Sequence, residues 1–209
     1  MDRKRSEVPS VQKTSKEKAY HHGNLRETLI EQGAYLIYQE GISNFSLRKL
    51  AKSVGVSATA CYNHFENVES LQKEMVRYVT DKLAEALEEA FKNNPCGEVS
   101  LSIGVAYVNF FAAYPHYFSL LFDSEVIDIR IMDEEIVSNI PFAPFDILLK
   151  SAKTELAKLQ IDEKELRDDL LIMWATVHGF AAMANMKGIH FEGDWGALTE
   201  KILRNKVKL

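Results

Sequence analysis

Residues Phe45–Phe65 read FSLRKLAKSVGVSATACYNHF, which predicts two short helices joined by a tight turn. Ser46 stands where a hydroxyl can cap the first helix by accepting from a free backbone N–H group of its first turn. Gly55 stands where the helix exit needs a left-handed backbone, and Ser57 can cap the second helix. Spacing of i, i+3, i+4 and i+7 predicts one apolar face on the first helix, formed by Leu47, Leu50, Ala51 and Val54.

The second helix, expected from Ala58 to Phe65, has two different sides. Cys61 and Phe65 lie four residues apart and share the side that faces the core. At about 100° per residue the opposite side carries Thr59, Ala60 and Asn63, with Tyr62 at its edge. Recognition in the major groove of DNA requires such a helix, held by apolar residues and presenting small and polar groups. Other helical hairpins with a glycine in the turn share the pattern, so the surrounding sequence also bears on the prediction.

The composition indicates a substantial core and no membrane span. The chain has 209 residues, of which 46% are hydrophobic, and no run of 18 or more apolar residues. Its N-terminus lacks the apolar stretch of a secretory signal. Cys61 and Cys96 lack metal-ligand spacing, so we expect free thiols in a reducing cytoplasm.

The sequence shows no pattern typical of an enzyme. Six histidines are scattered, and neither an HExxH motif nor a glycine-rich phosphate loop occurs. Asp133-Glu134-Glu135 and Asp168-Asp169 are expected to form solvated faces. We therefore predict that the protein is not an enzyme and uses no metal and no cofactor.

Charge is distributed unevenly along the chain. Residues 1–77 carry 12 Lys and Arg against 9 Asp and Glu, a net charge of +3. Residues 78–209 carry 13 against 21, a net charge of −8. A basic N-terminal part on an acidic remainder is typical of a protein that touches phosphate with one end only, although chance asymmetry gives the same numbers.

The whole chain predicts an all-α protein in four parts. Residues 1–19 are basic and lack apolar periodicity, so we expect a disordered arm that is either solvated or reaches DNA. We expect a helix-turn-helix domain over residues 20–67 and a connecting helix over 68–92. A larger C-terminal domain should occupy 93–209.

Helical periodicity sets the expected element boundaries. The first helix begins after Asn24, which with Glu27 resembles a capping box, and ends at Glu40. Asn67 can cap the long helix that follows the hairpin. From there, helices are expected over Val68–Lys92, Val99–Tyr114, a short segment after Pro115, the region near Asp133–Asn139, Phe145–Leu159, Lys164–Lys187 and Trp195–Lys206. No segment shows the period of a strand.

With these residues in place, the chain resembles TetR-type (TetR/AcrR) transcriptional regulators. The resemblance runs from about Tyr20 to Tyr78 and agrees in order and spacing with three helices, their caps and both turns. The matching residues are Gly23-Asn24-Leu25-Arg26, Phe45-Ser46-Leu47-Arg48-Lys49-Leu50-Ala51, Gly55-Val56-Ser57, Tyr62-Asn63-His64-Phe65 and Leu71. Farther on, Trp174, His178 and Gly179 resemble the tryptophan-histidine-glycine signature of one C-terminal subgroup.

The resemblance implies a homodimer that binds a near-palindromic operator in double-stranded DNA, and a C-terminal cavity whose small-molecule effector releases the DNA. Two recognition helices must then lie about 34–36 Å apart, one turn of the double helix. We expect the dimer interface to be a four-helix bundle built from Arg167–Met186 and Trp195–Leu203 of each subunit. Repression is the expected mode of regulation.

Matching the family's motif residue by residue gives the expected DNA contacts. Ser46 and Arg48 fall where the family contacts phosphate and base edges. The recognition face comprises Ser57, Ala58, Thr59, Ala60, Tyr62 and Asn63. The two alanines cannot hydrogen-bond bases, so base readout falls on Arg48, Thr59 and Asn63, with alanine methyl groups meeting thymine.

Two positions fit the motif less well. His64 holds a phosphate-contact position, although the helical wheel places it nearer the buried side, so we rank it below Tyr62. Val68 stands where many relatives have a lysine that meets phosphate, and Lys73 lies a turn later as an uncertain substitute.

An aromatic set in the C-terminal half is the candidate ligand pocket. Its members are Tyr107, Phe110, Phe111, Tyr114, Phe118, Trp174 and His178. One interpretation is a pocket wall in which His178 hydrogen-bonds an apolar or aromatic ligand. The other is a packed helix junction with a satisfied core histidine. Two alternative functions stay open. One is a DNA-binding protein that is gated by a protein partner and has no small-molecule effector, and the other is a helical interaction module that does not bind DNA.

Overall fold

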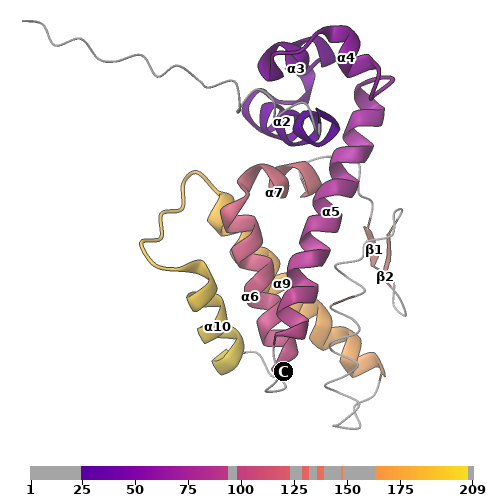
Figure 1. Ribbon diagram of the computed structural model, residues 1–209. Helices are drawn as coiled ribbons and strands as arrows, with labels where there is room; N and C mark the ends of the chain where they lie inside the picture. Colours follow the sequence, from indigo (N-terminus) through magenta and orange to yellow (C-terminus); the bar gives the residue numbers. More distant parts are fainter. Residues whose placement is uncertain are drawn as a thin grey trace, which may run out of the picture.

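The computed structural model describes residues 25–93, 98–122, 129–131, 136–138, 147 and 163–206. These ranges are almost wholly helical, which confirms the all-α prediction (Figure 1). The predicted arm 1–19, the predicted cap Asn24 and the predicted helix Phe145–Leu159, apart from Ile147, lie outside the described residues. None of the helices in these ranges is long and apolar enough to cross a membrane.

The N-terminal domain consists of α2 (Leu25–Glu40), η1 (Ile42–Asn44), α3 (Leu47–Val54) and α4 (Ala58–Tyr62). Its caps are the predicted ones. The Ser46 hydroxyl accepts from the Lys49 N–H group at 3.2 Å, and the Ser57 hydroxyl accepts from the Ala60 N–H group at 3.2 Å. Gly55 has φ = 80°, the left-handed conformation that side chains with a Cβ adopt only at a cost.

Helix α4 is shorter than predicted, because it ends at Tyr62 rather than Phe65. The N–H groups of His64 and Phe65 both bond to the Cys61 carbonyl, at 3.0 and 2.9 Å, so the chain tightens into a turn after Asn63. Phe65 is nevertheless 3% exposed and still packs in the core as predicted.

Helix α5 (Val68–Lys92) has the predicted bounds and leads from the N-terminal domain along the C-terminal one (Figure 1). Asn67 caps it as predicted, and Ser70 completes a capping box that the sequence analysis did not include. The Ser70 N–H group donates to Asn67 Oδ1 at 2.8 Å, and the Asn67 N–H group donates to Ser70 Oγ at 3.2 Å. Helix α5 buries residues at intervals of four along one side, and it also buries Val76, Thr80 and Ala84, because helices pack on more than one of its sides. The residues at intervals of four are Leu71, Met75, Val79, Leu83 and Leu87.

The C-terminal domain is organised around α6 (Val99–Ala113), which packs against α5, α9 (Glu163–Asn185) and α10 (Trp195–Lys206). Gly104 permits this close approach, since a Cβ there would lie 2.7 Å from Leu203 Cδ1 and 3.1 Å from Val177 Cγ1. The short helix α7 (Pro115–Phe122) lies between α2 and the rest of the C-terminal domain (Figure 1).

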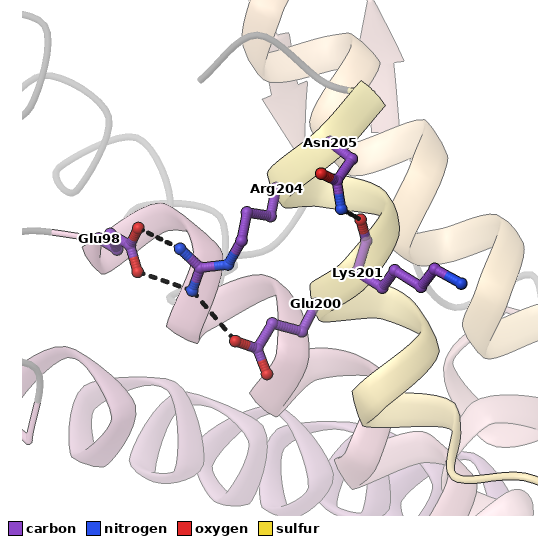
Figure 2. A network of polar contacts seen from close by, with 5 residues as sticks. All are labelled: Glu98, Glu200, Lys201, Arg204 and Asn205. Carbon is purple, nitrogen blue, oxygen red and sulfur yellow. Dashed lines mark hydrogen bonds and ion pairs between the residues drawn. The ribbon is translucent and has the colours of Figure 1, made fainter.

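A bidentate ion pair holds α10 to the start of α6 (Figure 2). Arg204 donates to the two carboxylate oxygens of Glu98 at 2.5 and 2.9 Å, and also to Glu200 at 3.1 Å. The side chains of Arg204 and Glu98 are 46% and 51% exposed, so solvent screens the pair. Its main contribution is therefore to orient α10 through the planar, two-point contact.

A small hairpin corrects two expectations, the absence of strands and the helix near Asp133–Asn139. Strands β1 (Ile129–Ile131) and β2 (Ile136–Ser138) pair antiparallel, with Arg130 opposite Val137. Both triplets contain β-branched Ile or Val, which favour extended backbone. Residues Ile136–Ser138 are therefore extended where a helix was expected.

Candidate functional site

The hairpin α3–α4 presents the recognition face outward, in the orientation expected. Cys61 is 0% exposed and pins α4 to the core, where burial also raises the pKa of its thiol. Thr59, Tyr62 and Asn63 are exposed, and 51% of the Tyr62 surface is open to solvent. Ala58 and Ala60 are half-buried. The predicted base-reading side chains therefore stand on the solvent side of a short and well-anchored helix.

The hydroxyl groups of the two capping serines can each still donate a hydrogen bond to a ligand. In each cap the hydroxyl oxygen of Ser46 or Ser57 accepts from backbone, which leaves its own O–H bond able to donate. A hydroxyl at a helix N-terminus beside backbone N–H groups suits a phosphate oxygen. Both serines can therefore cap their helices and meet DNA at the same time.

The cations around this surface differ in their availability. Lys49 bonds to Glu40 at 2.9 Å, and Lys73 bonds to Glu69 at 2.8 Å. Arg48 is exposed and forms no ion pair with the part of the chain that the structure describes. Of the three, Arg48 can contact a duplex without first breaking an ion pair with a carboxylate. Lys73 remains an uncertain substitute, because its exposed ammonium already has an acidic neighbour.

His64 corrects the helical wheel. Its side chain is exposed, and its ring lies 6.3 Å from that of Phe65. The wheel placed it toward the core by continuing α4 past Tyr62, but the helix has ended there. Exposure next to the recognition face fits the phosphate-contact position that the family resemblance implied.

A second group of side chains lies in the C-terminal domain and is called here the aromatic cluster. It consists of Tyr107, Phe110, Phe111, Phe118, Phe122, Trp174 and His178. The His178 ring lies 4.6 Å from Phe122 and 5.3 Å from Phe118, so α9 meets α7 through rings. Tyr114, predicted with this set, is 45% exposed and lies at the edge of the cluster, where its ring contacts Phe110, His116 and Tyr117.

A hydrogen bond and burial set the environment of His178. The Tyr107 hydroxyl and His178 Nδ1 lie 3.0 Å apart, and the imidazole tautomer decides which of the two groups donates. Burial lowers the pKa of His178 and raises that of Tyr107, so both are neutral at pH 7. The neutral imidazole carries its proton on Nε2 when the Tyr107 hydroxyl is the donor.

One polar group that connects three helices was not among the predicted site residues. Glu31 on α2 accepts hydrogen bonds from Tyr78 on α5 and Tyr117 on α7. No local sequence pattern predicts these contacts of Glu31, because its partners lie 47 and 86 positions farther along the chain. Among the described residues, no group of three or more His, Cys, Asp or Glu side chains is arranged to hold a metal ion.

Two family models match the chain. The model described as "Bacterial regulatory proteins, tetR family" matches residues 29–75. The model described as "Tetracyclin repressor-like, C-terminal domain" matches residues 101–205, half of the chain. In sequence, the chain is 25% identical over 96 residues to YobS of Bacillus subtilis (strain 168), described as an uncharacterized HTH-type transcriptional regulator. That alignment covers 46% of this chain and 50% of YobS, about half of each protein.

Solved structures share the fold over nearly the whole chain. A protein of unknown function from Rhodococcus sp. RHA1 superposes with a TM-score of 0.65 at 22% identity, covering 90% of this chain and 98% of that one. A TetR-family transcriptional regulator (HI0893) from Haemophilus influenzae superposes with a TM-score of 0.61 at 20% identity, covering 88% and 96%. At these identities the likeness concerns the fold.

Proposed function

Because the chain belongs to the TetR family of bacterial regulatory proteins, we propose that it is a ligand-responsive repressor that binds a near-palindromic operator as a homodimer. Family membership makes it a transcriptional regulator and not an enzyme. The proposal rests on one observation above all, the outward presentation of Thr59, Tyr62 and Asn63 on a capped helix that buried Cys61 holds in place. The protein would act in the cytoplasm, at the chromosome.

In this proposal the N-terminal domain reads DNA through two kinds of contact. Arg48, Thr59 and Asn63 meet base edges in the major groove, where the alanine methyl groups of α4 meet thymine. The hydroxyl and cationic groups around them would hold the phosphates and set the register, namely Ser46, Ser57, Tyr62, His64 and Lys73. Exposure of these polar side chains, apart from half-buried Ser46, supports the assignment.

The C-terminal domain would supply dimerisation and effector binding. Helices α9 and α10 form the proposed four-helix bundle with their copies in the partner and set the spacing of the two recognition helices. The aromatic cluster is the proposed effector site, with the Nε2–H group of His178 as donor to a polar atom of an otherwise apolar or aromatic molecule. Release of DNA then requires that the effector bind more tightly to a state whose spacing does not fit the operator.

Arg48→Ala is expected to weaken binding to the duplex that the wild-type protein selects from a random pool by about 1–3 kcal/mol and to relax its base preference. The loss follows from removing a cation without an ion-pair partner in the described residues. Fluorescence anisotropy measures the affinity, and a repeated selection measures the preference. Lys49→Ala is the matched control, because Lys49 already bonds to Glu40. Equal affinities for wild type and Arg48→Ala would remove Arg48 from the interface.

A cognate effector is expected to raise the free energy of unfolding by about 2.7 kcal/mol at 100 times its Kd. Differential scanning fluorimetry against small aromatic and aliphatic compounds measures the shift. His178→Phe keeps a ring in the cluster but removes the donor, so it should reduce the shift for the same compound. If no compound stabilises the wild type, gating by a protein partner becomes the better account.

A further inference from the structure

One carboxylate joins the two domains. Glu31 lies on α2 of the N-terminal domain, and its Oε1 accepts from the Tyr78 hydroxyl of α5 at 2.5 Å. Its Oε2 accepts from the Tyr117 hydroxyl of α7 at 2.5 Å. Lys82, one turn beyond Tyr78, places its ammonium 3.9 Å from the same carboxylate. In Figure 1, α7 lies directly below α2 and beside α5, so three helices meet at this point.

Both tyrosines act as donors to Glu31. Burial, together with the carboxylate itself, raises the pKa of Tyr78 and of Tyr117 far above the ordinary value, so both phenols stay protonated. The single proton of Tyr78 also faces Glu27 at 2.9 Å, but the contact with Glu31 is the shorter one. Hydrogen bonds to a charged acceptor are stronger and more directional than neutral ones. Glu31 is therefore held at two fixed points.

The α7 end of this connection is rigid and lies beside the aromatic cluster. Tyr117 is 2% exposed, and its ring stacks on Tyr114 at 5.1 Å and on Phe110 at 5.9 Å. The next residue, Phe118, places its ring 5.3 Å from that of His178. Because Phe118 follows Tyr117 in α7, a displacement of Phe118 also moves Tyr117, which is hydrogen-bonded to Glu31 of the N-terminal domain.

We propose that Glu31 is a positioning residue for DNA binding: held by the hydroxyls of Tyr78 and Tyr117, it fixes the angle of the N-terminal domain against the C-terminal domain. The proposal rests on the function proposed above and adds the route by which the aromatic cluster regulates it. Breaking the Tyr117 bond leaves the N-terminal domain with a wider range of orientations. Fewer molecules then have both recognition helices at the spacing of the operator, and the apparent affinity falls.

The first test measures orientation without DNA. Spin labels are placed on the full-length protein at Lys52→Cys on α3 and at Glu89→Cys near the end of α5, both exposed positions, with Cys96 replaced by Ser and buried Cys61 retained. Labelled chains are diluted with unlabelled chains, so that pulsed electron paramagnetic resonance records distances within one chain. Tyr117→Phe and Glu31→Ala are expected to broaden the distance distribution.

Tyr114→Phe is the matched control, because it removes a hydroxyl from the ring stacked on Tyr117 and leaves both Glu31 bonds in place. Its distance distribution should equal that of the parent. Circular dichroism establishes whether each variant is folded. If Glu31→Ala does not fold, Tyr117→Phe, which removes only the hydroxyl oxygen, is the variant that tests the proposal. An unchanged distribution in Tyr117→Phe overturns the proposal.

The second test measures affinity for the duplex that the wild type selects from a random pool. Glu31→Ala and Tyr117→Phe should each weaken binding about five- to tenfold, a typical coupling between distant sites. The double variant should bind no more weakly than Glu31→Ala, because both changes break the same bond. If Glu31 contributes only to stability, Glu31→Ala and Tyr117→Phe will lower thermal stability, but their affinities and distance distributions will equal those of Tyr114→Phe. That outcome refutes the proposal. If the wild type selects no duplex, the proposed function fails, while the distance measurement still tests Glu31.

Discussion

Phe111→Ala is expected to lower the free energy of unfolding by about 3–5 kcal/mol, the cost of deleting a fully enclosed ring. Phe111 is 0% exposed, and four rings surround it at centroid distances of 4.9 to 5.6 Å, those of Tyr107, Phe110, Phe118 and Phe122. The truncation leaves a cavity that α6 and α7 cannot close, because other helices hold both in place. Urea denaturation followed by circular dichroism, at one protein concentration for all variants, measures the change.

Tyr114→Ala provides the comparison, since Tyr114 comes from the same predicted aromatic set but is 45% exposed. It should cost about 1 kcal/mol or less, as is typical of exposed positions. The pair of results separates the two interpretations of this set, core and pocket wall. A loss of less than about 1 kcal/mol for Phe111→Ala would mean that its ring lines open space, and the core interpretation of that position would be wrong.

Ile172→Asp is expected to convert the proposed dimer to monomers and to weaken binding to the selected duplex at least about 100-fold. Ile172 lies on α9 and is 53% exposed, although it is a large apolar residue on a proposed interface helix. In a two-fold symmetric interface both copies gain a desolvated carboxylate. Loss of the second N-terminal domain removes the effective concentration that bivalent binding provides. Sedimentation velocity measures the mass, and anisotropy measures the affinity.

Ile42→Asp is the matched control for the mass, because Ile42 is the same residue type and 44% exposed but lies in η1 of the N-terminal domain. This variant should remain a dimer. A dimer that persists in Ile172→Asp would place the interface elsewhere than on this face of α9. A wild-type protein that sediments as a monomer at micromolar concentration would remove the proposed operator geometry altogether.

The sequence predicted the N-terminal domain well because its signals are local. Ser46, Ser57 and Asn67 cap helices through contacts that span three residues, and Gly55 takes the left-handed turn that its position demanded. The errors were local as well. Helix α4 ends at Tyr62 because its last N–H groups close a tight turn, and this placed His64 outside rather than inside. The β-branched triplets of β1 and β2 were not long enough to show the period of a strand.

Burial of α5 marks the limit of periodicity. Its apolar residues at intervals of four, from Leu71 to Leu87, are buried, yet Val76, Thr80 and Ala84 are buried too. A single stripe describes a helix with one neighbour, whereas α5 packs against α2, α6 and α7. The identity and position of those neighbours depend on the whole topology. The aromatic set shows the same limit, because Tyr114 shares its composition and periodicity with the rest but stands at the surface.

By itself the sequence determined most of the helices, the caps of α3, α4 and α5 and the outward face of α4, since each depends on backbone and side-chain contacts within about four positions. Only the tertiary structure decided which groups that are distant in sequence form hydrogen bonds with each other. Tyr107 meets His178 across 71 positions, and Glu31 meets Tyr117 across 86. Such pairs follow from how helices pack, and packing is set by the sum of many weak apolar contacts that no single stretch of sequence contains.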